Sequence, residues 1–345
     1  MRQHFSTRKY LATGWFNKSR RMNKKIIISI FTTALLITGC SKDTDVFIPD
    51  ATPGPDTSWQ PTITATMPVI ELRNSLLLPA FTDSVEISSN AATLNTPIGM
   101  QVIFPPNCCV SAAGIPVTGK IQVEIMSLKK KGDMIRMNRP TTHGDSLLIT
   151  AGELFIRLKK EGAPALLAPG VKLYIRYTDL PTNPAMKLFF GDETNPEAFN
   201  WLANNDPQNN FITAGTQAYE IYTNHLRWIN IASIQNTSSV PTVKVAADLA
   251  PYFTNTNTIA FTVFKDQRSV AGMPGNLAAK KFLSTGLPLG KPVTVVVISK
   301  LANDYYLGYE SAVTSTPGSG VPYQSVTIRP VKKTLPEILA YLGSL

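Results

Sequence analysis

The chain has 345 residues, with 33 Lys or Arg against 23 Asp or Glu and a formal net charge of +10. Eight of the basic residues lie in residues 1–39, which contain no acidic residue, so the remaining chain carries 25 basic and 23 acidic residues. Because this remainder is almost neutral, the charge argument for nucleic-acid binding disappears.

The segment from Met22 to Cys40 has the parts of a secretory signal. Two lysines, Lys24 and Lys25, precede an apolar run over residues 26–37, and small residues follow before Cys40. A positive start, a short apolar stretch and small residues at a cleavage point are typical of such a signal. The run of about a dozen residues is shorter than the roughly 20 that a membrane-spanning helix needs. Residues 1–39 are therefore expected to be a leader, starting at Met22 or, with a longer basic region, at Met1.

The end of this signal, Ile37-Thr38-Gly39-Cys40, resembles the lipobox of bacterial lipoproteins. The resemblance implies that the Cys40 thiol is acylated, that the chain is cut before it, and that the acyl chains hold the protein to a membrane. Ser41 resembles the residue of lipoproteins sorted to the outer membrane, and residues 41–45 resemble an export signal for surface display in one Gram-negative phylum. We therefore expect a lipid-anchored outer-membrane protein that faces the periplasm or the cell surface.

Residues 41–66 are rich in Ser, Thr, Asp and Pro. Such a composition buries too little apolar surface to offset the chain entropy. The sequence therefore predicts a lipidated, disordered tether over residues 40–66, followed by the folded part of the chain.

The next region, residues 67–234, is dominated by alternation of apolar and polar residues. This pattern runs through 121–126, 154–159 and 171–178 and is typical of antiparallel strands with one buried and one wet face. Turn sequences at 105–107, 131–133, 168–170 and 191–192 separate the strands. Many short strands at this spacing indicate an all-β sandwich or barrel.

A second β region is predicted over residues 243–333, after a linker at 235–242. Its strand candidates are 258–264, 291–299 and 325–329, and its size suits a small immunoglobulin-like sandwich, although no Cys-Trp-Cys signature is present. A helix is predicted over residues 334–345, because Thr334 and Glu337 form a capping-box pattern before an apolar stripe. Such a stripe packs on its own domain or, alternatively, docks a partner.

Residues 81–180 resemble the zona-occludens/netrin-receptor (ZU-type) β-sandwich domain found in secreted bacterial proteins. The matching pieces are 97–105, 117–125 and 147–155: a strand ending in Phe-Pro, a Gly-led strand, and a small-residue step into another strand. The resemblance implies an interaction or spacer module. Some eukaryotic members cleave themselves at a His-Phe-Ser step, but here that triplet occurs at residues 4–6 of the leader, and His225 is followed by Leu226 and Arg227. We expect no autoproteolysis.

Other chemistry finds little support in the sequence. His143-Gly144-Asp145-Ser146 places three triad residue types together, but a triad needs residues converging from separate elements, so a polar turn is expected. Two histidines outside the leader, His143 and His225, cannot form a multi-histidine zinc site. Asp192, Glu193, Asn195 and Glu197 form an acidic loop or, less simply, a calcium site. The sequence predicts no catalytic residue, no cofactor and no metal.

A cysteine pair and a run of three lysines have plain structural explanations. Neighbouring residues such as Cys108 and Cys109 are about 3.8 Å apart at Cα, which strains a disulfide, so one buried and one partly exposed thiol are expected. Redox sensing or an intermolecular disulfide is the alternative. Lys129-Lys130-Lys131 suits a solvated hairpin tip or, alternatively, a surface for an acidic partner.

Aromatic residues gather between positions 201 and 228, and exposed aromatic rings stack on sugar rings. The candidate ligand-binding residues are Trp201, Tyr219, Tyr222 and Trp228, although period-two placement would make several of them core residues. Three functions follow: a lipid-anchored, non-enzymatic interaction or spacer protein; a glycan-binding surface lipoprotein of a nutrient-uptake system; or a hydrolase with an unrecognised site. We favour the first, with an unknown protein or glycan partner.

Overall fold

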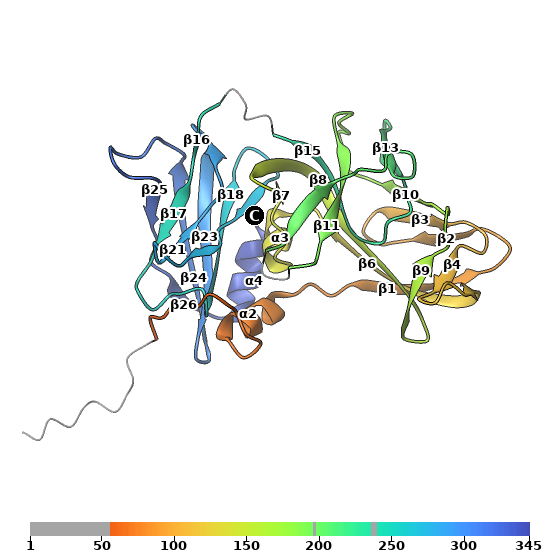
Figure 1. Ribbon diagram of the computed structural model, residues 1–345, viewed down its shortest axis with the longest axis horizontal. Helices are drawn as coiled ribbons and strands as arrows, with labels where there is room; N and C mark the ends of the chain where they lie inside the picture. The colour runs from red at the N-terminus through yellow and green to blue at the C-terminus, as the bar shows by residue number, and fades with distance from the viewer. Residues whose placement is uncertain (1–55, 196–197, 236–239) are drawn as a thin grey trace, which may run out of the picture. The chain divides into compact units, whose positions relative to one another are not determined.

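A computed structural model describes residues 56–195, 198–235 and 240–345 (Figure 1). Strands account for 48 % of these residues and helices for 8 %, so the all-β class is confirmed. The leader, Cys40 and the first part of the predicted tether lie outside the described residues. The described residues belong to one compact unit.

Two facing sheets build the first half of this unit. Sheet 1 has ten strands and sheet 2 has five, all antiparallel to their neighbours. Sheet 1 consists of β12 (Asn200–Ala203), β11 (Lys187–Asp192), β15 (Arg227–Ile234), β8 (Ser146–Lys160), β9 (Ala163–Leu167), β4 (Cys109–Ser111) and β5 (Pro116–Val117), with β6 (Gly119–Leu128), β1 (Phe81–Ile87) and β7 (Thr142–His143) joined through β8. Sheet 2 consists of β13 (Phe211–Ala214), β14 (Tyr219–Thr223), β10 (Leu173–Tyr177), β3 (Met100–Phe104) and β2 (Ala92–Asn95).

Two further sheets build the second half. Sheet 3 contains β20 (Gly275–Asn276), β21 (Lys281–Leu283), β17 (Val245–Asp248) and β25 (Gln324–Thr327), and β17 runs parallel to β25. Sheet 4 contains β19 (Val270–Gly272), β18 (Thr258–Phe264), β23 (Pro292–Leu301), β24 (Asp304–Val313) and β26 (Val331–Lys333). A short pair joins β16 (Thr242–Val243) to β22 (Leu287–Pro288). The strands predicted at 258–264, 291–299 and 325–329 are thus present as β18, β23 and β25.

Three apolar cores lie between these layers. Core 1 fills the space between sheets 1 and 2 with residues such as Ile156 and Ile175. Core 2 lies on the other face of sheet 1, where Trp228 meets the sheet 4 residue Phe261 and the three helices. Core 3 separates sheet 4 from sheet 3, with Val295 on one side and Phe282 on the other. Figure 1 shows the resulting order: sheet 3, sheet 4, helices α3 and α4, sheet 1, sheet 2.

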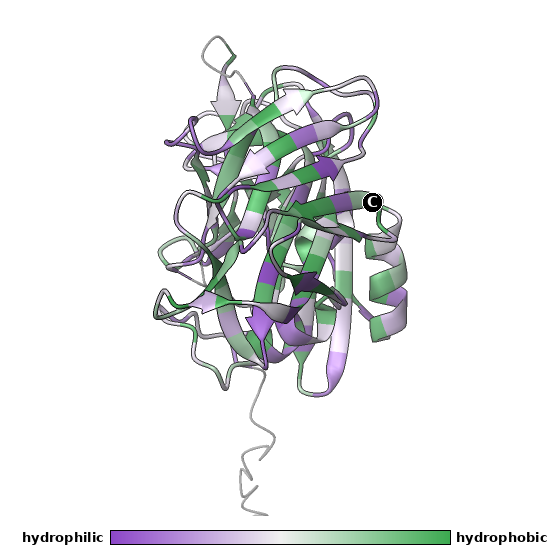
Figure 2. Ribbon diagram, turned by 90° about the vertical axis from the view of Figure 1, so that its right-hand side faces the viewer, coloured by the Kyte–Doolittle hydropathy of each residue, from purple (hydrophilic) through white to green (hydrophobic). Residues whose placement is uncertain are grey.

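The middle layers are buried on both faces, which the alternation did not predict. Alternate residues of β23 enter core 3 and core 2, so the strand reads as a continuous apolar run. In β8 the residue Leu154 faces core 1 and its neighbour Phe155 faces core 2. The predicted wet face of residues 154–159 is therefore wrong for the first part of that stretch, because sheet 4 and the helices cover it. Sheet 2 keeps the expected alternation in β3, β10 and β14, and Figure 2 shows hydrophilic and hydrophobic residues interchanging along the strands at the sheet 2 end.

The predicted C-terminal helix is confirmed as α4 (Leu335–Gly343), including its capping box. Thr334 Oγ1 accepts from the Glu337 N–H at 3.4 Å, and Glu337 Oε2 accepts from the Thr334 N–H at 2.8 Å. The apolar stripe packs inside the molecule, because Ile338 and Leu342 are fully buried in core 2.

The described part of the chain contains two other helices, which were not predicted. In α2 (Pro68–Leu76), buried Val69, Leu72 and Leu76 recur at helical spacing and enter core 2. Residues 131–133, predicted as a turn, begin α3 (Lys131–Arg136), whose Met134 and Ile135 are buried in core 2. Burial of these two side chains stabilises the short helix more than its Gly132 destabilises it.

The last part of the predicted tether, from residue 56 onward, contacts the folded unit. Trp59 lies 5.0 Å from the Phe282 ring, and Gln60 exchanges two hydrogen bonds with Asn255, at 3.0 and 2.6 Å. Ile63 packs against core 2. The single tryptophan and the isolated isoleucine therefore attach this end of the polar segment to the folded unit, although its average composition is that of a linker.

Candidate functional site

Three of the four aromatic candidates are core residues. Trp201 is fully buried in core 2, where its Nε1–H donates to Pro140 O at 3.0 Å. Trp228 is 1 % exposed and packs 5.0 Å from the Phe155 ring. Tyr219 is also 1 % exposed, and its hydroxyl accepts from the Asn183 N–H at 2.7 Å. The faces of these rings are covered by protein, so none of them is available to stack on a sugar from solvent.

The fourth candidate, Tyr222, lies on the outward face of sheet 2 in a row of rings. The strand register places Phe211, Tyr222 and Tyr174 side by side on β13, β14 and β10. The ring centroids are 4.8 Å apart between Phe211 and Tyr222 and 5.0 Å apart between Tyr222 and Tyr174. We call these three residues the aromatic row. Phe211 is 39 % exposed, so the row reaches solvent at the edge strand.

A row of polar side chains runs beside the aromatic row, two residues away from each ring on β13, β14 and β10, and continues onto β3 and β2. Cross-strand register aligns its members, which we call the polar row: Thr213, Glu220, Arg176, Gln101 and Asn95. Within this row Gln101 Nε2 donates to Asn95 Oδ1 at 2.8 Å. Because side chains two residues apart share a face of a sheet, donors and acceptors lie directly beside the rings.

The two rows affect each other electrostatically. The pKa of Tyr174 is raised, mainly by loss of hydration and then by the negative charge of Glu220. The polar row contains one cation and one anion, Arg176 and Glu220, so its formal charge is zero. This surface can therefore offer apolar contact and hydrogen bonds to an uncharged polar ligand. The near-parallel stacking of Phe211 on Tyr222, at an interplanar angle of 19°, means that each of these rings covers one face of the other.

The His143–Ser146 segment is a structural turn. His143 pairs with Ser146 across the β7–β8 hairpin. The ring Nδ1 of His143 lies 2.7 Å from Trp201 O, and the Gly144 N–H donates to Asn200 Oδ1 at 2.8 Å. These contacts attach the turn to β12, as the polar-turn interpretation requires.

Two carboxylates of the acidic loop are hydrogen-bonded to protein groups. Asp192 Oδ1 accepts from the N–H and the hydroxyl of Thr194 at 3.0 and 2.6 Å. Glu193 forms two hydrogen bonds with Arg227, at 2.8 and 2.9 Å. Glu197 lies outside the described residues. Among the described residues, no group of three or more His, Cys, Asp or Glu side chains is arranged to hold a metal ion.

The two neighbouring cysteines are both fully buried free thiols in core 1. Their Sγ atoms are 3.6 Å apart. The prediction of one partly exposed thiol is therefore wrong. The two cysteines come after β3 in the chain, and both side chains are buried between sheets 1 and 2. The hydrogen bond between the two thiols and burial together raise the pKa of Cys109.

Sequence reasoning missed a buried carboxyl group on the core 2 face of sheet 1. Glu153 is fully buried, and within the described part of the chain neither carboxyl oxygen has a hydrogen-bond partner. Asn230 lies opposite it in the β8–β15 register, and the Nδ2 of that amide is also unsatisfied. Burial raises the pKa of Glu153 well above its usual value, and the Arg139 charge opposes this only in part. The sequence signal for this buried carboxyl group was an acidic residue within the otherwise apolar stretch 151–155.

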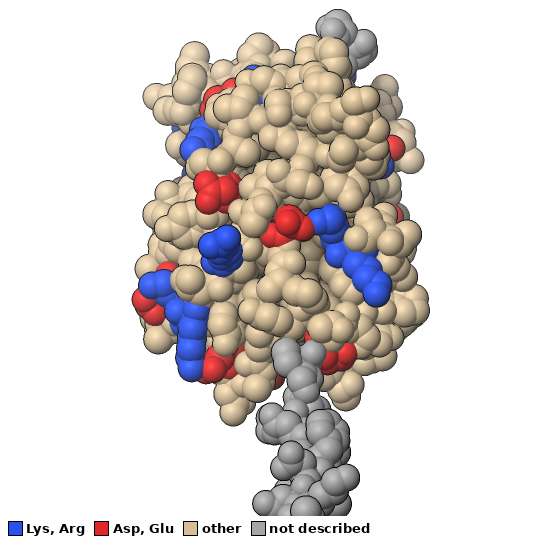
Figure 3. Space-filling model, turned by 90° about the vertical axis from the view of Figure 1, so that its left-hand side faces the viewer, with Lys and Arg blue, Asp and Glu red and all other residues tan. Residues whose placement is uncertain are grey.

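The predicted lysine hairpin tip is also wrong, because Lys131 starts α3 and all three ammonium groups are held by main-chain carbonyls. Lys129 donates to Thr178 O at 2.5 Å, Lys130 to Gly343 O at 2.9 Å, and Lys131 to Phe264 O at 2.6 Å. The face shown in Figure 3 carries only scattered acidic and basic groups.

No protein-family model and no curated protein matches this chain. Within the described residues, no helix is both long enough and apolar enough to cross a bilayer.

Proposed function

We propose that this protein is a lipid-anchored, non-enzymatic protein of the outer membrane, facing the periplasm or the cell surface, whose β-sheet layers act as an interaction or spacer module. The observation that carries the proposal is the signal from Met22 to Cys40, with two lysines, a short apolar run and a lipobox-like end. The acyl chains on Cys40 are the anchor, and each buried CH₂ group contributes about 0.8 kcal/mol, so several chains together hold almost permanently.

The stacked layers support the spacer role. Core 2 is common to sheet 1, sheet 4 and the helices, and buried side chains such as Phe155 and Val296 belong to it from either side. A shared apolar core resists bending more than a polar linker does, because separating the layers would expose its side chains to water. Such a unit holds whatever binds its far end at a fixed distance.

We further propose that residues 81–180 are a ZU-type sandwich and residues 243–333 an immunoglobulin-like one. The three pieces that carry the first resemblance coincide with β3, with β6 and with the first part of β8. The absence of self-cleavage is part of this proposal and is checked on a denaturing gel, where the mature protein should run as a single band.

Anchoring is tested by metabolic labelling with an alkyne-bearing fatty acid. The wild-type protein should take up label and sediment with membranes, whereas Cys40→Ala should be unlabelled and either released or left as an uncleaved precursor. Cys109→Ala is the matched control, because that thiol is buried in core 1 and should not affect labelling. An N-terminus upstream of Cys40, or an unacylated Cys40, would contradict the proposal.

A second candidate function is glycan binding, favoured by the aromatic row with the polar row beside it on the open face of sheet 2. Rings beside convergent hydrogen-bonding groups suit the apolar face and hydroxyl groups of a sugar. Tyr174→Ala and Tyr222→Ala should abolish retention on a glycan array. Tyr309→Ala is the control, since Tyr309 is 54 % exposed on β24 of sheet 4. Equal retention of all three variants would remove this candidate.

A further inference from the structure

Two basic segments that are far apart in sequence line one pocket. Lys129 and Lys130 connect β6 to α3, which begins at Lys131, and Lys265 and Arg268 come from the loop between β18 and β19. The pocket has a volume of about 320 Å³, and its remaining lining residues are Asp266, Gln267 and Leu345. We call it the basic pocket. Five basic residues and one acidic side chain line it.

The contacts of the three consecutive lysines fix their positions without neutralising them. Their acceptors are the carbonyl oxygens of Thr178, Gly343 and Phe264, which belong to the sheet 2 side, to α4 and to β18. A carbonyl accepts a hydrogen bond but carries no net charge, so each ammonium group keeps its full positive charge. The basic pocket is therefore preorganised, because its cations are already held in place.

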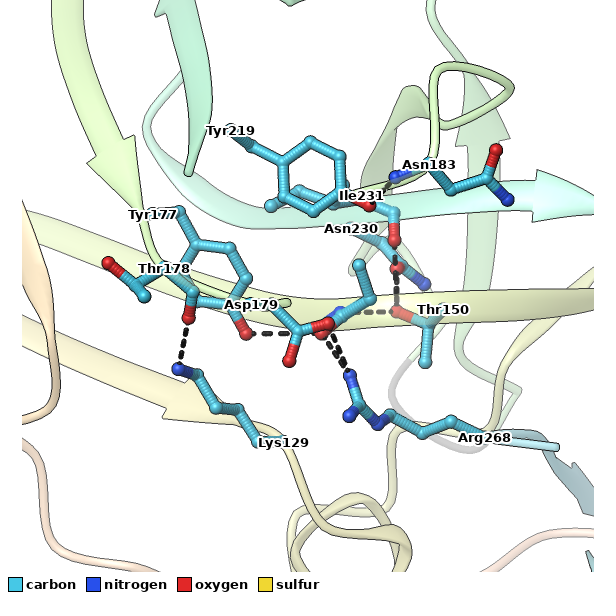
Figure 4. A network of polar contacts seen from close by, with 12 residues as sticks. Lys129, Thr150, Tyr177, Thr178, Asp179, Asn183, Tyr219, Asn230, Ile231 and Arg268 are labelled. Carbon is cyan, nitrogen blue, oxygen red and sulfur yellow. Dashed lines mark hydrogen bonds and ion pairs between the residues drawn. The ribbon is translucent and has the colours of Figure 1, made fainter. Parts of the chain in front are cut away.

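Among the described residues, Arg268 is the pocket cation that forms an ion pair with a carboxylate, and the pocket residue Asp266 pairs with a lysine outside the pocket. Asp179 pairs with Arg268 at 3.0 Å, and Figure 4 shows this pair beside Lys129 and the Thr178 carbonyl. Asp266 pairs with Lys291 at 3.0 Å. Within the described residues, none of the four pocket lysines has a carboxylate oxygen within 4.0 Å, and Lys265 is held by the hydroxyl of Ser311.

Two of the held lysines are partly desolvated, and Arg268 repels them. Burial lowers the pKa of Lys129 and of Lys131, and the positive charge of Arg268 lowers both further, while nearby aspartates oppose the effect. A multiply charged anion would relieve this repulsion and would find several N–H donors converging on it.

We propose that the basic pocket binds a phosphate group, carried either by a phospholipid head group or by a small soluble phosphate compound. A compact pocket of lysines suits a phosphate, because the ammonium group acts as a point charge on phosphate oxygens. A nucleic acid would need an extended basic stripe along its backbone, whereas these cations gather at one place. The inference does not require acylation of Cys40, so its failure would leave the anchoring proposal intact.

The test uses the mature full-length protein in micelles of a neutral detergent. One arm measures binding of radiolabelled inorganic phosphate and of glycerol 3-phosphate by equilibrium dialysis. The other adds phosphatidylglycerol or, for comparison, phosphatidylcholine to the micelles and measures lipid retained by native mass spectrometry. Binding in the first arm identifies a soluble source, and retention of phosphatidylglycerol alone identifies a lipid source.

The decisive variant combines Lys130→Gln with Lys265→Gln, two exposed pocket residues whose replacement leaves the buried contacts of Lys129 and Lys131 in place. Binding should weaken at least tenfold. Lys187→Gln with Lys332→Gln is the charge-matched control, since both lysines are exposed on strands outside the basic pocket, and it should bind like the wild type. No binding of any phosphate probe, or equal binding by the pocket variant, would overturn the proposal.

Discussion

Sheets 1 and 2 enclose core 1 together but differ in what lies on their other faces. Sheet 2 leaves its second face to solvent. Along its strands, polar residues on that face, such as Arg176 and Gln101, alternate with buried residues on the core 1 face. The second face of sheet 1 is covered by core 2 over β8 and β15, where Phe155 and Trp228 are buried. A polar side chain on the second face of sheet 1, such as Glu153, is therefore fully buried where core 2 covers that face.

This difference separates two kinds of aromatic residue that look alike in the sequence. Trp228 and Tyr222 are six positions apart and both lie in strands, but one fills core 2 and the other lies in the aromatic row. A residue on a sheet's second face is a binding candidate only where no further layer covers that face.

The prediction with the largest expected effect compares Trp228 with Tyr222. Trp228→Ala should lower the free energy of unfolding by about 3–5 kcal/mol, because it removes a large side chain from a packed core. Tyr222→Ala should lower it by at most about 1 kcal/mol, the usual contribution of a cross-strand pair at an open face. Urea unfolding followed by circular dichroism gives both values. Similar losses for the two variants would contradict the distinction between covered and open faces.

The sequence predicted those features that depend on neighbours within one element. Alternation located β6 and β10, and the Thr334–Glu337 pattern located the start of α4. It did not show that β8 is buried on both faces, because the covering residue Phe261 is about a hundred positions away. For the same reason the meeting of Lys129 with Arg268 was not foreseeable, since it depends on how sheet 4 packs against sheet 1.

The second prediction concerns the helices that cover sheet 1. A Cβ atom at Gly132 of α3 would lie 1.7 Å from Leu342 O of α4, so only glycine allows the two helices this approach. Gly132→Ala should therefore lower the free energy of unfolding by about 1–3 kcal/mol, as overpacking does in other cores. Gly343→Ala is the control, because a Cβ there meets nothing within 4 Å. Melting temperatures of the two variants decide the matter, and an unchanged value for Gly132→Ala would show that the helices separate easily.

The third prediction tests the effect of covering a carboxyl group. Below about pH 4.3, the ordinary pKa of Glu, Glu153 is neutral in both folded and unfolded chains. As the pH rises, the unfolded chain ionises while the raised pKa keeps the folded group protonated, so stability falls with pH. Glu153→Gln should remove this loss and stabilise the protein by about 1–2 kcal/mol at pH 7, with less effect at pH 4.

The control for this prediction is Glu220→Gln, on the open face of sheet 2. Urea midpoints at pH 4 and pH 7 should diverge for the Glu153 variant only. Equal behaviour of both variants would mean that water reaches Glu153 in solution, and that core 2 is less tightly closed than its packing indicates.

The smallest effect concerns the capping box at the start of α4. Thr334→Ala should cost about 1 kcal/mol, since it removes the acceptor for the Glu337 N–H. Hydrogen bonds from Lys333 and Thr334 lower the pKa of Glu337 to about 2, so this carboxylate contributes fully above about pH 4.3 and loses its contribution as the pH falls toward 2. Amide hydrogen exchange should show faster exchange in α4 for Thr334→Ala at pH 7 and, in the wild type, on acidification, while β3 and β10 around core 1 keep their protection. If those strands also lost protection, cores 1 and 2 would open as one unit, and the difference between the two faces of sheet 1 would be one of packing and not of independent stability.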